Sequence, residues 1–74
     1  MREATLTIKM GNAAFTNPEY PEGHEAQRTT AAYELSHILE ELAMRTIMQT
    51  TSDCIRAVDS NGNTVGYLTI EEKD

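Results

Sequence analysis

Asp59, Asn61 and Asn63 stand at alternate positions, which is the spacing of the first ligands of a calcium-binding loop. Such a loop also needs a glycine at its sixth position and a bidentate glutamate at its twelfth. Counted from Asp59, those positions hold Thr64 and Ile70, so the calcium pattern fails. The Asn61-Gly62 pair instead predicts a tight β-hairpin turn, in which both turn residues would adopt positive φ angles.

The remaining reactive side chains form no catalytic or metal-binding pattern. Ser36 and His37 are sequence neighbours, as are Glu40 and Glu41, and side chains one position apart on a helix diverge. Cys54 has no adjacent His or Lys to activate it, and the two histidines and this cysteine lack zinc-ligand spacing. We therefore expect no catalytic residues, no metal and no cofactor, and a protein that is not an enzyme.

The charge balance points to a protein partner. The 74 residues include 12 acidic and 6 basic side chains, giving a net charge of −6. Direct binding to nucleic acid needs clustered Lys and Arg, so we do not expect it. An acidic surface suits a basic protein surface, although the same charge also serves solubility.

Size and composition give two further expectations. A chain this short has a small core and is marginally stable without a disulfide, a metal, an oligomer or a partner. The single cysteine excludes an intrachain disulfide, so an oligomer or a partner is the natural supplement. No apolar run reaches the roughly 20 residues of a membrane span, and Met1-Arg2-Glu3 opens no signal region. A location in a reducing cytoplasm follows as an expectation.

The order of elements is predicted to be β-α-β-β. Residues 4–10 alternate apolar and polar side chains, which indicates a half-buried strand. Residues 11–23 form a loop because Pro18 and Pro21 exclude a helix there, and Phe15 closes the edge of the core. The helix occupies residues 24–50 and is opened by Pro21 or capped by Thr29 or Thr30; the hairpin strands are 53–58 and 64–70.

Two stripes run along this helix. The core stripe is Ala31, Leu35, Ile38, Leu39, Leu42 and Thr46. Tyr33, His37, Met44 and Met48 lie opposite it, within a sector of roughly 60°, and are bordered by Glu40 and Glu41. Methionine and tyrosine are enriched at interfaces, so the second stripe is either a dimer or target-binding face or a solvated face with incidental methionines.

Pairing outward from Asn61-Gly62 assigns the two faces of the hairpin. It places Val58 opposite Val65, Arg56 opposite Tyr67 and Ile55 opposite Leu68. The apolar face consists of Ile55, Ala57, Gly66, Leu68 and Ile70, with small residues where the helix could approach closely. The opposite, exposed face consists of Cys54, Arg56, Val58, Val65, Tyr67 and Thr69.

The expected fold is a single α+β domain spanning residues 1–74, with one long helix packed on a three-stranded, mainly antiparallel sheet. Strand 64–70 is placed in the middle, antiparallel to strand 4–10, which runs parallel to strand 53–58. One sheet face and both edges stay open, and open edges are binding surfaces.

Three segments in this order resemble a family of small proteins of bacteriophages and prophages. They are Asn12-Ala13-Ala14-Phe15, the helix from Glu34 to Ala43, and Asp59-Ser60-Asn61-Gly62-Asn63-Thr64-Val65-Gly66. The resemblance covers most of the chain, and segment 18–30 is longer than the family pattern. It implies the β-α-β-β fold, an accessory phage role and no catalytic residues. In size and acidity the chain is also similar to anti-CRISPR proteins.

We therefore expect a phage-encoded, non-enzymatic inhibitor in the host bacterial cytoplasm. It would bind a surveillance complex of a defence system such as CRISPR, with carboxylates in the places of nucleic-acid phosphates. The alternative is a small phage structural or assembly protein that forms a homodimer through the helix stripe or a sheet edge. The expected contact residues are Tyr33, Glu34, His37, Glu40, Glu41, Met44, Met48, Arg56 and Tyr67.

Overall fold

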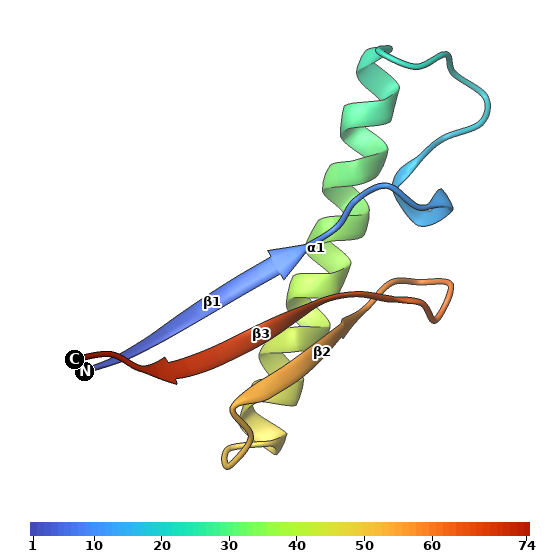
Figure 1. Cartoon of the computed structure of the whole chain (residues 1–74). Helices are drawn as coiled ribbons and strands as arrows, with labels where there is room; N and C mark the ends of the chain where they lie inside the picture. The colour runs from blue at the N-terminus through green and yellow to red at the C-terminus, as the bar shows by residue number, and fades with distance from the viewer.

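The protein folds as one helix against a small antiparallel sheet (Figure 1). The computed structural model describes all residues, Met1–Asp74. Its elements are β1 (Arg2–Ile8), a 3₁₀ turn η1 (Ala13–Phe15), α1 (Glu25–Met48), β2 (Cys54–Val58) and β3 (Thr64–Glu72). The strand order is β1-β3-β2 with both pairs antiparallel, which confirms the predicted α+β fold and the central place of the last strand.

Strand β1 begins and ends earlier than its alternation predicted. It pairs with β3 from Arg2 opposite Glu72 to Ile8 opposite Gly66, whereas the predicted strand was 4–10. The earlier start arises because β3 continues to Glu72 and so gives Arg2 and Glu3 partners. Alternating side chains identify a strand but not the point at which its neighbour ends.

The helix begins at a cap that the sequence pattern did not single out. His24 is the N-cap, and its Nδ1 accepts a hydrogen bond of 3.0 Å from the N–H of Ala26. Neither Thr29 nor Thr30 caps the helix, because both lie inside it. The Gln27 side chain ties the preceding loop to the first turn of α1. It bonds to the backbone of Asn17 and Tyr20.

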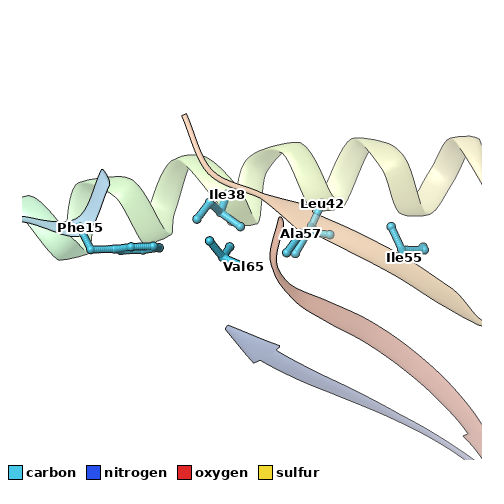
Figure 2. Close-up of a cluster of buried hydrophobic side chains, with 6 residues drawn as sticks. All are labelled: Phe15, Ile38, Leu42, Ile55, Ala57 and Val65. Atoms are coloured by element: carbon cyan, nitrogen blue, oxygen red, sulfur yellow. The ribbon is translucent and has the colours of Figure 1, made fainter. Parts of the chain in front are cut away.

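The core is a single row of side chains contributed by η1, α1, β2 and β3. Figure 2 shows Phe15 at one end and Ile55 at the other, with the remaining members between them. The cluster is Phe15, Ile38, Leu42, Ile55, Ala57 and Val65. Phe15 is 3% exposed, which confirms its predicted place in the core.

The predicted core stripe of the helix is too wide. Leu39 is 44% exposed, so its assignment to the core is wrong. The cause is that α1 packs against β2 and η1 only along a narrow strip. The rest of the sheet does not cover the helix. Only the row of positions four residues apart, Glu34, Ile38 and Leu42, is buried on the helix.

The terminal halves of β1 and β3 form an arm that extends beyond the helix (Figure 1). The radius of gyration is 14.3 Å, whereas a compact domain of this length has one of about 11 Å. The chain ends lie together at the tip, where the N–H of Lys73 bonds to the carbonyl of Met1 at 2.6 Å. On the helix side of this arm Leu6 stays 39% exposed.

The hairpin loop is longer than the predicted two-residue turn. Gly62 has a φ of +85°, while no residue other than glycine has a positive φ, so the expectation for Asn61 is wrong. Two backbone hydrogen bonds close the loop. The Gly62 N–H donates to the carbonyl of Asp59 at 3.0 Å, and the Asp59 N–H donates to the carbonyl of Asn63 at 2.9 Å. A glycine at the end of such a turn supplies the one left-handed residue that this loop needs.

A bulge shifts the hairpin register next to the loop. The predicted pairs Ile55–Leu68 and Arg56–Tyr67 are confirmed. The predicted Val58–Val65 pair is wrong, because Val58 lies opposite Thr64 and the register shifts between Ala57 and Val58. The bulge turns Val65 inward, where it is only 6% exposed, instead of leaving it on the open face.

Gly66 is needed for a close contact, but with a strand and not with the helix. A Cβ atom at Gly66 would lie 1.8 Å from the carbonyl oxygen of Thr7 and 3.0 Å from the Cα of Ile8. The predicted approach of α1 to this glycine is therefore replaced by the approach of the β1 backbone. Strand β3 can lie this close to the backbone of β1 only because position 66 has no side chain.

Candidate functional site

The predicted contact residues lie in three separate parts of the fold. Glu34 is buried, Arg56 and Tyr67 lie on the sheet face away from the helix, and the rest lie on α1 where it faces solvent. The sheet face and the solvent side of α1 point in opposite directions, because α1 packs on the other side of the sheet. One flat partner surface cannot contact both.

Glu34 links the helix to the hairpin loop. It is only 7% exposed, and its Oε1 accepts hydrogen bonds from the backbone N–H of Ser60, at 3.0 Å, and from the Ser60 hydroxyl. Its predicted position on the acidic surface is corrected to a buried one. A single glutamate among exposed glutamates carries no sequence signal of this kind, since its partner lies 26 residues away.

Asp59 holds the hairpin loop together from inside. Its Oδ1 accepts from the N–H groups of Asn61 at 3.0 Å and Asn63 at 2.9 Å. Its Oδ2 accepts from Asn12 Nδ2 at 2.6 Å, while Asn12 Oδ1 has no partner. Asn12, Glu34 and the loop come from the three segments that carry the phage-family resemblance. Their hydrogen bonds join the hairpin loop to the start of η1 and to α1, and we call this set of contacts the clamp.

These contacts perturb the acidity of Asp59. Burial raises the pKa of Asp59, but hydrogen bonds from the Asn63 N–H, the Asn12 amide and the Asn61 N–H stabilise the charged form and together hold its pKa below the usual value. A carboxyl whose pKa is lower in the folded state stabilises the fold above its unfolded pKa of about 3.9 and loses that contribution as the pH falls through the folded pKa.

Asp59→Asn is therefore expected to weaken the fold most at neutral pH. The introduced amide also has only one acceptor oxygen, which cannot serve both Asn12 Nδ2 and the backbone N–H groups of Asn61 and Asn63. Urea unfolding of both proteins at pH 7 and at pH 3 measures the effect: the difference in stability should shrink at pH 3. A constant difference at the two pH values would show that the Asp59 charge does not stabilise the fold.

The solvent side of α1 presents exposed apolar side chains next to carboxylates. Tyr33 is 75% exposed, Met44 65% and Met48 79%. Ile47, which the sequence reasoning left out, is 77% exposed and lies nine residues from the buried Ile38, on the opposite side of the helix at 100° per residue. We call this surface the outer helix face; its members are Tyr33, His37, Glu40, Glu41, Met44, Ile47 and Met48.

The charges on the outer helix face leave it acidic. His37 Nε2 lies 3.9 Å from Glu41 Oε1, and Glu40 makes no ion pair within the chain. Arg45 is nearby, but its guanidinium bonds to the carbonyl of Arg56 at 2.9 Å and so is turned toward the sheet. A surface hollow of about 380 Å³ opens among these side chains, between His37, both glutamates, Met44 and Arg45.

The open sheet face has a different character. Arg56 and Tyr67 lie directly opposite each other on β2 and β3, and Tyr67 is 48% exposed. A shallow depression of about 780 Å³ lies beside Tyr67, where Lys9 is the only charged side chain. Its lining is Thr7, Lys9, Gly11, Asn12, Thr64, Val65, Gly66, Tyr67 and Thr69. These groups include no carboxylate, no histidine and no cysteine.

No group of three or more His, Cys, Asp or Glu side chains is arranged to hold a metal ion. Helix α1 lacks the long apolar run that crossing a bilayer requires. Comparisons of the chain with protein-family models, with curated proteins and with solved structures found no match.

Proposed function

We propose that the protein is a non-enzymatic inhibitor that binds a host protein complex through the outer helix face. The observation that carries this proposal is the combination of four exposed side chains, Tyr33, Met44, Ile47 and Met48, with the unpaired carboxylate of Glu40 on one side of one helix. A purely solvated helix face carries polar and charged side chains instead. Aromatic and methionine side chains supply buried contact area in protein interfaces.

The acidity of this face favours a basic partner. Glu40 lies at the rim of the apolar side chains without a cation of its own, and the whole chain has a net charge of −6. A groove that normally holds nucleic acid is lined by Lys and Arg, and a carboxylate-bearing helix can occupy it. The resemblance to phage proteins supports a bacterial defence complex as the owner of such a groove, with the CRISPR surveillance complexes as the leading class. The protein would then act in the host cytoplasm.

Binding to purified surveillance complexes tests this proposal. Each complex is mixed with an excess of the protein, passed over a sizing column and assayed for target DNA binding. We expect co-elution with at least one complex and loss of its DNA binding. Co-elution without loss of DNA binding would leave a binding protein that is not a nucleic-acid mimic, and absence of co-elution from every complex would reject this class of target.

A further inference from the structure

The geometry points to a second binding surface, the free edge of β1, which fits β1 of a second copy of this chain. Strand β1 is at the outside of the sheet, since the strand order is β1-β3-β2. Neither the helix nor another segment covers its outer side in Figure 1, and the strand contains no proline and no bulge. Natural proteins usually protect an edge strand by such devices.

The backbone groups on this edge are those of the even-numbered residues. The N–H of Lys9 bonds to Val65 on β3 at 2.7 Å, and the carbonyl of Met1 accepts from Lys73. In an antiparallel pair alternate residues point to the neighbour, so odd-numbered residues of β1 bond to β3. The N–H and C=O groups of Ala4, Leu6 and Ile8 therefore point outward, where a further strand could form hydrogen bonds with them.

In one antiparallel register, two β1 strands pair compatible side chains on both faces of the sheet. Placing Leu6 opposite Leu6 of the second copy puts Ala4 opposite Ile8 on the helix side of the sheet. The same register puts Glu3 opposite Lys9 on the open face, twice per dimer. Because the even-numbered residues then form the hydrogen-bonded pairs, the outward backbone groups of both strands are used.

Charge and exposure favour this occupant over a foreign strand. Neither Glu3 nor Lys9 makes an ion pair within its own chain. Glu3 lies opposite Glu71, whose carboxylate already pairs with Lys73 at 3.3 Å, so Glu3 is the carboxylate of this pair that has no cation of its own. Leu6 is 39% exposed on an arm that α1 does not cover, and a second Leu6 would shield it. The result is a continuous sheet through both copies, with a two-fold axis at Leu6.

Proline substitutions separate this edge from the rest of the fold. Ala4→Pro removes an outward N–H and should leave the β1–β3 ladder intact, whereas Thr5→Pro removes an inward N–H and should damage it. Light scattering at several concentrations should give the wild type twice its chain mass of 8.3 kDa and Ala4→Pro a single chain mass, with unchanged circular dichroism. Met44→Lys should keep the dimer, because the outer helix face is not used.

A charge exchange tests the register. Glu3→Lys alone and Lys9→Glu alone each place like charges opposite one another, and we expect each to dimerise about tenfold more weakly than the wild type. Mixing the two variants should restore a dimer, since every Lys then faces a Glu. A monomeric wild type would overturn the inference, as would single variants that dimerise like the wild type. A dimer lost in Met44→Lys but kept in Ala4→Pro would assign the contact to α1 instead.

Discussion

Gly66→Ala is expected to remove a large share of the stability of the fold and to lower its thermal midpoint strongly. The added methyl group would lie 1.8 Å from the carbonyl oxygen of Thr7, which belongs to the backbone of β1 and cannot rotate away. Relief requires β1 to separate from β3 at Ile8, which also packs against the core. Steric overpacking alone costs about 1–3 kcal/mol, and loss of ladder hydrogen bonds adds to it. A domain of this size has a total stability of only about 4–11 kcal/mol.

Gly11→Ala is the matched control. A Cβ atom at Gly11 meets nothing within 4 Å, and its φ is not positive, so the same change there should alter stability by less than about 0.5 kcal/mol. Thermal unfolding followed by circular dichroism compares the three proteins. Equal midpoints for Gly66→Ala and the wild type would mean that β1 and β3 are not as close as the structure has them.

The clamp around Asp59 adds side-chain contacts that fix the position of the hairpin loop. Without it, the loop between β2 and β3 would rest on two backbone hydrogen bonds, those that join Asp59 to Gly62 and to Asn63. Asp59 adds side-chain bonds within the loop and one to Asn12, and Ser60 adds the contacts to Glu34. Asn12, Glu34 and Asp59 thus serve the fold, and the proposed binding surface consists of residues outside the clamp.

The overall fold could be predicted because its signals are local. Alternation in β1, the long helical period and the turn at Gly62 each depend on a few adjacent residues, and the antiparallel order follows from them. The bulge that buries Val65 could not be predicted, because it depends on how the loop closes. The exposure of Leu39 depends on the width of the sheet beneath α1, which no helical period encodes.

The candidate site shows the same division between local and long-range information. Helical spacing placed Tyr33, His37 and Met44 on one side of α1, and the structure has them there. Glu34 was misplaced because it lies at the edge of the buried stripe, and only a distant partner, Ser60, makes burial of its carboxyl group favourable. Arg56 and Tyr67 were placed on the right face of the hairpin, but that face points away from the helix site.

Reversing the two charges of the outer helix face should abolish target binding without unfolding the protein. Glu40→Lys/Glu41→Lys turns an acidic rim into a basic one that repels a basic groove, and we expect at least about 100-fold weaker binding, because like charges across an interface cost several kcal/mol. Both side chains are exposed, so the thermal midpoint should stay within a few degrees of the wild type.

Glu19→Lys/Glu22→Lys is the control for this variant. It changes the net charge by the same amount, at two exposed positions of the loop before α1. If binding responds only to the net charge of the chain, the two double variants should lose affinity equally. If it depends on the outer helix face, the loop variant should bind within a few-fold of the wild type.

Displacement of labelled target DNA from a surveillance complex, followed by fluorescence anisotropy, tests the central claim most directly. The wild type and the loop variant Glu19→Lys/Glu22→Lys should displace the DNA at close to one equivalent of protein per complex. The helix variant Glu40→Lys/Glu41→Lys should leave the DNA bound at the same concentrations. Equal displacement by all three proteins, or none by the wild type with any complex, would contradict the assignment of the outer helix face as the inhibitory surface.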